Sequence, residues 1–167
     1  MNFFTADYHF NHDSKDGGII AYCNRPFKDL DHMNNELIKR HNERVGKRDT
    51  VFHIGDFCFG RKSYAEEFLD RLNGTVILLS GNHDPNNGVK SIIDYICVRT
   101  YGMDVLLTHK EERAHEIREH FGFCLVGHSH EKWKFKERMC NVGVDVWGYY
   151  PIHMQQILKA YKKEYGK

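Results

Sequence analysis

The stretch TVILLSGNHD, residues 75–84, decides the fold of this chain. Its first half is a run of branched apolar residues, which is typical of a strand that is buried on both faces of a sheet. Gly81, Asn82, His83 and Asp84 follow directly. Glycine permits a sharp turn and a close approach of a ligand, and amide, imidazole and carboxylate groups are common metal ligands. The stretch therefore predicts a metal site at the end of a buried strand.

The same arrangement recurs along the chain. Apolar runs that we interpret as strands occupy residues 2–5, 50–54, 75–79, 105–108 and 123–126. These runs lead into metal-binding residue types at Asp7 and His9, Asp56, Asn82, His109, and His128 and His130. In an α/β sheet, the carboxyl ends of the strands border one crevice. We therefore expect these side chains to meet at one place.

The spacing of the histidines supports this expectation. Asp7 and His9 are two residues apart, and His128 and His130 repeat the spacing. In extended chain, such neighbours project to the same side and can reach one ion together. A single histidine at a strand end is usually packed or hydrogen-bonded in the core, and His109 taken alone would favour that account. Because four other motifs with metal-binding residues also follow strands, we expect His109 to be a metal ligand.

Helical periodicity separates the strands. Apolar residues at helix-face spacing predict helices around residues 30–45, 64–72, 114–121 and 152–161, and Asp29 or Asp31 is available to cap the first. Strands that alternate with helices predict a layered α/β domain with a substantially parallel sheet. No repeat or linker divides the chain, so we expect a single domain over residues 1–167.

The composition excludes several classes of protein. Lys and Arg number 24 against 23 Asp and Glu, a formal charge of +1, so nothing favours nucleic acid or an anionic membrane as an obligatory partner. The five cysteines are scattered without a CxxC pair, which favours reduced thiols. No apolar run approaches the roughly 18 residues of a spanning helix, and the first residues do not resemble a signal peptide. We therefore expect a cytoplasmic protein.

In order, the motifs are Asp-x-His, Gly-Asp, Gly-Asn-His-Asp, a lone His after a strand, and Gly-His-x-His, over residues 7–130. This ordered set resembles the calcineurin-like metallophosphoesterase superfamily. The stretch HFNHDSKDGGIIAYCNRPF, residues 9–27, is similar to a small bacterial and phage-type single-domain branch of that superfamily. The resemblance implies an α/β fold, a layered β-sandwich flanked by helices, and a binuclear hydrolase that acts on phosphate esters.

The resemblance also implies a ligand set for two divalent ions. One ion would be held by Asp7, His9, Asp56 and His130, and the other by Asp56, Asn82, His109 and His128, with Asp56 as the bridging carboxylate. We expect Mn²⁺ first, with Fe, Zn, Ni or Co as alternatives, because this donor set suits them better than it suits calcium. Many members carry an acid or amide three residues after the bridging Asp, where this chain has Phe59.

Two such ions would favour an anionic phosphate ester, activate a water and clamp the attacking and leaving oxygens. The leaving group then needs a proton. His83, between Asn82 and Asp84, is the predicted general acid, and Asp84 is predicted to hold its ring. His12 and Arg25 follow the first motif, where we expect contact with substrate; Arg25 could grip a phosphate oxygen, and a surface salt bridge is the alternative.

The segment EKWKFKER, residues 131–138, alternates basic and aromatic residues and predicts a half-buried strand with a basic outer face. The charge either protects an edge strand from aggregation or leads a nucleotide or nucleic-acid strand towards the metals. We expect a phosphate-ester small molecule or nucleotide as substrate. A metal-dependent nuclease or nucleotide phosphodiesterase is the alternative enzyme, and a catalytically silent protein-binding scaffold is an alternative of another class.

Overall fold

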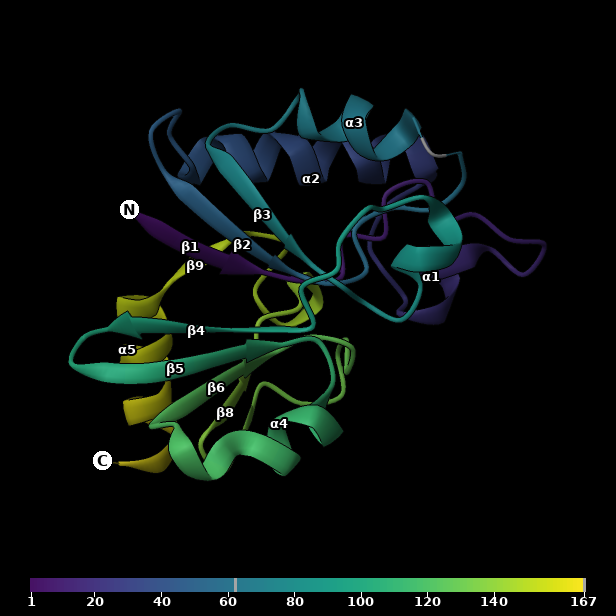
Figure 1. The fold of residues 1–167 in the computed structure, drawn as a ribbon. Coiled ribbons are helices and arrows are strands. Elements are labelled where there is room, and N and C mark those ends of the chain that lie inside the picture. Colours follow the sequence, from purple (N-terminus) through teal and green to yellow (C-terminus); the bar gives the residue numbers. More distant parts are fainter. Residues whose placement is uncertain (62, 167) are drawn as a thin grey trace.

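The computed structural model describes residues 1–61 and 63–166, which form two β-sheets packed between helices (Figure 1). The first sheet has the order β3-β2-β1-β9 and consists of β1 (Asn2–Thr5), β2 (Thr50–Ile54), β3 (Thr75–Leu79) and β9 (Ile152–His153). β1, β2 and β3 run parallel, and β9 pairs antiparallel with β1. The carboxyl ends of the three parallel strands therefore lie at one edge of this sheet.

The second sheet has the order β4-β5-β6-β8-β7. Its strands are β4 (Tyr95–Thr100), β5 (Met103–Thr108), β6 (Phe123–Val126), β7 (Phe135–Lys136) and β8 (Met139–Asn141). β5, β6 and β8 run parallel, and the outer strands β4 and β7 are antiparallel to their neighbours. Each sheet thus has a parallel centre and at least one antiparallel edge.

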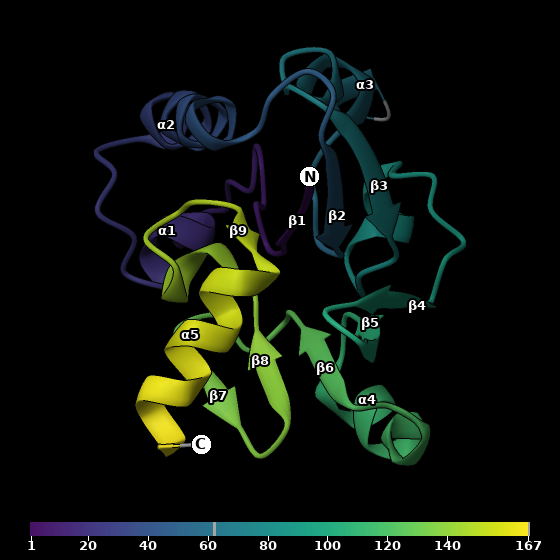
Figure 2. The same ribbon diagram turned by 90° about the vertical axis from the view of Figure 1, so that its left-hand side faces the viewer.

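Helices cover both sheets (Figure 2). α2 (Leu30–Arg44) and α3 (Ser63–Leu69) lie on the first sheet, α4 (Glu111–Ile117) lies on the second, and α5 (Met154–Tyr165) packs along one side of the sandwich. α1 (Gly18–Tyr22) lies beyond the carboxyl ends of the strands, and short 3₁₀ helices span Asp84–Asn87, Arg118–His120 and Val144–Val146. Among the described residues, no helix has the length and apolar character needed to cross a membrane.

The main core lies between the two sheets. Phe4 and Ile54 of the first sheet and Leu107 and Leu125 of the second are fully buried in one cluster. The outer faces are buried as well, because α2 and α3 cover one and α4 covers the other. Burial on both faces explains why β1, β2 and β6 appear in the sequence as continuous apolar runs. The prediction that β3 is buried on both faces is wrong, because β3 lies at the edge of its sheet and is mostly half-buried. The predicted α/β fold, layered and flanked by helices, is confirmed.

The structure differs from the sequence prediction at the edges. The alternation of strands and helices predicted a substantially parallel sheet, whereas the structure has two mixed sheets, the β-sandwich that the resemblance implied. β4, with alternating exposed and half-buried residues, was not predicted. The fourth helix begins two residues later than predicted, because Ile152 belongs to β9. The side chain of His153 caps α5 by accepting the backbone N–H of Gln155, and the side chain of Gln156 accepts the backbone N–H of His153.

The prediction of a basic strand over residues 131–138 is also wrong. Only Phe135 and Lys136 form a strand, and Glu137, at φ 54°, starts a tight turn into β8. Lys134 is half-buried, with its Nζ atom 3.7 Å from the ring centroid of Trp147. The turn and this packing break the alternation, so the four basic residues do not form one outer face.

Candidate metal centre

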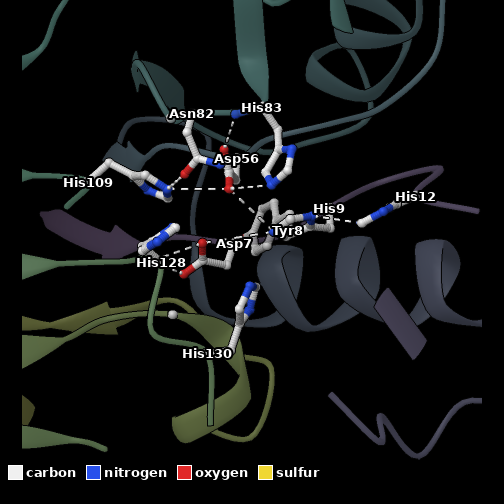
Figure 3. A network of polar contacts seen from close by, with 12 residues as sticks. Asp7, Tyr8, His9, His12, Asp56, Asn82, His83, His109, His128 and His130 are labelled. Atoms are coloured by element: carbon white, nitrogen blue, oxygen red, sulfur yellow. Dashed lines mark hydrogen bonds and ion pairs between the residues drawn. The ribbon is translucent and has the colours of Figure 1, made fainter. Parts of the chain in front are cut away.

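The predicted ligands gather beyond the carboxyl ends of β1, β2, β3, β5 and β6 (Figure 3). They form two clusters, and within each cluster the ligand atoms all lie within 4.8 Å of one another. The Asp7 group consists of Asp7, His9 and His130, and the Asp56 group consists of Asp56, His109 and His128. Asn82 joins the second group, because its Oδ1 atom lies 3.2 Å from His109 Nε2. The structure therefore brings all the predicted ligands together.

Asp56 lies between the two groups. Its Oδ2 atom is 3.3 Å from His109 Nε2 in its own group and 3.6 Å from His9 Nε2 in the other. The carboxylate is almost fully buried, with 1% of the side chain exposed. A single carboxylate oxygen that faces imidazoles of both groups has the position that a bridging ligand needs.

Two buried polar atoms test whether cations fit this site. His9 Nε2 and Asp56 Oδ2 have no hydrogen-bond partner among the described residues. Leaving such atoms unpaired away from water costs up to several kcal/mol each, in order of magnitude. The donor set of imidazole, carboxylate and amide suits divalent first-row transition metals. A cation at each group would satisfy the unpaired atoms, so the residues fit the ions that the sequence implies.

The pKa shifts of Asp7 and His109 also indicate that a cation fits the centre. Burial raises the pKa of Asp7 to about 6. Burial opposes a charge on His109, but its close contact with Asp56 and the charges of Asp7 and Asp56 outweigh this and raise its pKa to about 9. His109 Nδ1 donates to the Ile54 carbonyl over 2.8 Å, so its Nε2 atom is the one that faces Asp56 Oδ2, at 3.3 Å. Positive charge is therefore favoured where a cation would bind.

The backbone at the ligands adopts an uncommon conformation. The φ angles are 59° at Asp7, 52° at His9, 58° at Asp56, 66° at His128 and 46° at His130. Non-glycine residues rarely occupy this left-handed region, and such strained positions cost about 1–3 kcal/mol each. The sequence suggested that Asp7 and His9 lie in extended chain, and the structure shows that they do not. They reach one group because the chain coils after β1 ends at Thr5.

Asp84 supports the loops of the centre. Its carboxylate accepts the backbone N–H groups of Asp56 and Phe57 at 2.9 Å and of Gly81 at 2.7 Å. The residue is fully buried, so these three donors supply the hydrogen bonds that water would otherwise supply. The prediction that Asp84 holds the His83 ring is therefore wrong. Asp84 instead ties the loop after β2 to the loop after β3.

Glycine is required where these loops meet. A Cβ atom at Gly81 would lie 2.2 Å from the backbone nitrogen of Asp56. At Gly55, where φ is +82°, a Cβ atom would lie 2.5 Å from His109 Nδ1. Real Cβ atoms do not approach other atoms so closely, so any side chain at either position would displace a ligand. At both positions the absence of a side chain lets two loops of the centre approach each other closely.

His83 lies above the centre and faces solvent. Its backbone N–H donates to Asp56 Oδ1 over 3.0 Å, and its Nε2 atom is 4.0 Å from Asp56 Oδ2. Its side chain is 46% exposed. The ring borders a cavity of about 250 Å³ that is also lined by His9, His12, Ile19, Tyr22, His128, His130 and Lys132. His83 can therefore meet a molecule that enters this cavity.

His12 lies beside the Asp7 group. Its Nδ1 atom is 3.0 Å from His9 Nδ1, and its ring stacks on Phe59 with the centroids 3.8 Å apart. Burial, with the charges of His83 and Arg25, lowers the pKa of His12 to about 4. Phe59, the departure from the superfamily pattern, thus packs as a wall of the site. The neutral His12 ring borders the cavity where we expected a substrate contact.

The side chain of Arg25 does not reach the cavity where we expected it to contact substrate. Its guanidinium is buried and makes two hydrogen bonds with the carboxylate of Asp145, Nε to Oδ1 over 2.8 Å and Nη2 to Oδ2 over 2.9 Å. This is a buried ion pair and not a surface salt bridge, and its donors face the protein and not the cavity. The predicted role of Arg25 as a phosphate clamp is therefore wrong.

Asp145 was missed in the sequence. Its Oδ2 atom lies 3.2 Å from His130 Nδ1, so it contacts a predicted ligand directly. It follows no long apolar strand and belongs to no recognised motif, because it lies in the short 3₁₀ helix Val144–Val146. Its position after Gly143 in the segment NVGVD was the only available signal.

Comparisons with known proteins place these observations in a family. Residues 29–147 match the calcineurin-like phosphoesterase superfamily domain. An uncharacterized protein of Methanocaldococcus jannaschii is 32% identical over 170 residues, which cover 96% of this chain and 91% of that protein. Asp7, His9 and Arg25 precede the range matched to the superfamily domain, and the match to the archaeal protein extends over nearly the whole chain.

Solved structures share the fold. The crystal structure of a protein of unknown function from Aquifex aeolicus has a TM-score of 0.72 at 24% identity, covering 96% of this chain and 98% of that one. A novel archaeal phosphodiesterase has a TM-score of 0.50 at 18% identity, covering 85% of this chain and 81% of that one. At these identities the likeness concerns the fold. The domain match over residues 29–147, more than half of the sequence, shows that this chain belongs to the calcineurin-like phosphoesterase superfamily.

Proposed function

We propose that this protein hydrolyses a phosphodiester with two divalent metal ions. One ion would bind Asp7, His9, Asp56 and His130, and the other Asp56, Asn82, His109 and His128. The observation that carries the proposal is the pair of buried, unpaired atoms, His9 Nε2 and Asp56 Oδ2, which face each other at 3.6 Å where the two groups meet. A protein-binding scaffold without metal has no use for this arrangement.

When bound, the two ions would supply an activated water and a clamp for the attacking and leaving oxygens at phosphorus. The residues of the chain do the rest. The left-handed loops hold the ligands before substrate arrives, so little reorganisation is needed during the reaction. We propose that His83 donates a proton from its ring to the leaving oxygen, and its exposure at the cavity supports this role.

A diester is favoured over a monoester by the openings around the centre. One cavity of about 250 Å³ reaches His9, His128 and His130. A second cavity of about 380 Å³ reaches Asn82 and His109 from the side of Lys110 and Arg113. A diester carries two organic groups, and each cavity can accept one. The archaeal structural neighbour is itself a phosphodiesterase. The test below compares a diester with a monoester.

The remaining features of the proposal follow from the donor set and the chain. We propose Mn²⁺ as the first metal to test, with Fe, Zn, Ni and Co as alternatives, because all of them accept this mixture of ligands. The two sheets share one core, which supports a single domain over the whole chain. We also propose a cytoplasmic location, where the five cysteines, all among the described residues, would stay reduced.

The test combines metal content with turnover. Protein purified without chelator is analysed for metals and then assayed in Mn²⁺ with bis-p-nitrophenyl phosphate and p-nitrophenyl phosphate. We expect close to two ions per chain and faster turnover of the diester. Asp56→Asn should lose bound metal and turnover. The control Asp104→Asn, at an exposed salt bridge with Arg99, should keep the metal content and turnover of the wild type. Absence of metal and of turnover in the folded wild type would refute the proposal and favour the scaffold.

A further inference from the structure

Arg25 connects distant parts of the centre. Besides its two bonds to Asp145, its Nη2 atom donates to the Asp7 carbonyl over 2.8 Å and its Nη1 atom to the Tyr8 carbonyl over 3.0 Å. These carbonyls belong to the coil in which Asp7 and His9 adopt left-handed φ angles. One guanidinium therefore fixes the strained backbone of two residues of the Asp7 group.

The third residue of the Asp7 group is fixed through Asp145. His130 Nδ1 lies 3.2 Å from Asp145 Oδ2, and the Asp145 side chain is only 2% exposed. An imidazole that donates its Nδ1–H to a carboxylate keeps its Nε2 lone pair for a metal and has a fixed ring orientation. Arg25 in turn holds the carboxylate from its other side. The ring orientation of His130 thus depends on both charged residues.

The Asp56 group is oriented by different contacts. His109 Nδ1 donates to the Ile54 carbonyl, a backbone group that belongs to β2. The Asp56 loop is held by the Asp84 carboxylate, and neither Arg25 nor Asp145 donates to or accepts from a residue of this group in the described part of the chain. The contacts of Arg25 and Asp145 therefore reach the Asp7 group alone. The two groups also touch each other, because the His9 N–H donates to the Asp56 carbonyl over 3.1 Å and the His128 N–H donates to the Asp7 carboxylate over 3.0 Å.

We propose that Arg25 and Asp145 form a positioning pair that serves the Asp7 group and not the Asp56 group. The inference rests on the proposed function, because it assumes that both groups bind metal. Loss of the pair should weaken one ion selectively and leave the other. Neither residue contacts the reacting atoms, so their effect is on the affinity and geometry of the Asp7 group.

Asp145 could instead be a ligand itself, since Cys23, His130 and Asp145 also lie within reach of one point. The hydrogen bonds argue against this alternative. The two Asp145 oxygens already accept from Arg25 Nε, Arg25 Nη2 and His130 Nδ1, which uses three of about four lone-pair positions. The cluster thus orients His130 and is poorly suited to hold a further ion.

The experiment measures metal binding rather than activity. Metal-free wild type, Asp145→Asn and the double variant Arg25→Met with Asp145→Leu are titrated with Mn²⁺ by calorimetry, below their melting temperatures. His130→Asn identifies the ion of the Asp7 group, and Asp104→Asn is the matched control at an exposed ion pair. The double variant removes both charges together, which preserves the fold more often than removing one partner does.

We expect two ions in the wild type and in the control. In Asp145→Asn and in the double variant, the ion that is lost in His130→Asn should bind about 10–100-fold more weakly, and the other ion should keep its affinity. Cys23→Ser should bind both ions like the wild type. Wild-type affinities for both ions in the folded variants would overturn the inference, as would equal weakening of both. A wild type that binds no Mn²⁺ would instead refute the proposed function.

Discussion

The backbone N–H of Asp56 donates to the carboxylate of Asp84 over 2.9 Å, although 28 positions separate the two residues in the chain. The same carboxylate accepts from Phe57 and Gly81, so it joins the loops that follow β2 and β3. A residue that belongs to the most recognisable motif of the sequence therefore has a supporting role beneath the metal ligands.

We predict that Asp84→Asn destabilises the metal-free protein by about 2–5 kcal/mol, because a buried acceptor of three backbone donors loses its charge and one acceptor oxygen. Urea unfolding in the presence of chelator measures this change. The exposed Asp104→Asn should alter the free energy of unfolding by less than about 0.5 kcal/mol. An Asp84→Asn protein with wild-type stability would show that the three bonds contribute little.

His83→Ala should slow hydrolysis of diesters with poor leaving groups by about 10²–10⁴-fold, because the leaving alkoxide then lacks a proton donor. Nitrophenyl esters should be affected little, since nitrophenolate leaves without protonation. Steady-state kinetics over a series of leaving groups checks the prediction. Metal content should stay at the wild-type value. Equal losses across the series would remove His83 from the role of general acid.

The contribution of His53 to the stability of the metal-free protein should fall as pH falls from about 6.5 towards 3. Burial lowers the pKa of His53 to about 3, and neither ring nitrogen has a hydrogen-bond partner among the described residues. Below pH 6.5 the unfolded chain binds a proton at His53 that the folded protein excludes, so stability is lost on acidification and is fully present above pH 6.5.

His53→Phe isolates this contribution, because the ring packs against Tyr8 and Phe57 and a phenyl group can fill the same space. Unfolding free energies of both proteins are measured in chelator at pH 7.5, 6 and 5. The wild type should lose more stability than His53→Phe between the highest and the lowest pH. Parallel pH profiles would assign the acid sensitivity to other residues.

Gly81→Ala should weaken metal binding and reduce stability, because the new Cβ atom would lie 2.2 Å from both the backbone nitrogen and Oδ1 of Asp56. The loop must move, and Asp56 would move with it. Gly122→Ala is the matched control, since its Cβ atom would meet Met103 Cβ at an ordinary 3.4 Å. Calorimetric titration with Mn²⁺ and thermal melting test the difference. Tight binding in Gly81→Ala would show that the loops adapt.

Much of the fold could be predicted from local pattern. The four strands at Asn2–Thr5, Thr50–Ile54, Thr75–Leu79 and Phe123–Val126 have the predicted bounds. Three of them are almost wholly buried, so their apolar character is continuous and easily recognised, and the half-buried edge strand β3 is also apolar after Thr75. β4 and β7 lie at sheet edges, where exposed positions accept Tyr, Cys, Arg and Lys, and their patterns are correspondingly weak. The division into two sheets depends on pairings between distant segments, which no local pattern specifies.

The sequence by itself determined the order of the motifs, the layered fold and the residues that gather at the centre, because metal-binding chemistry restricts these positions to few residue types. Only the tertiary structure decided that Asp84 supports loops, that Asp7 and His9 lie in left-handed coil, and that Arg25 pairs with Asp145. The last two residues are 120 positions apart. The direction of a charged side chain depends on which partner folding brings beside it, and that partner is not encoded in the neighbouring residues.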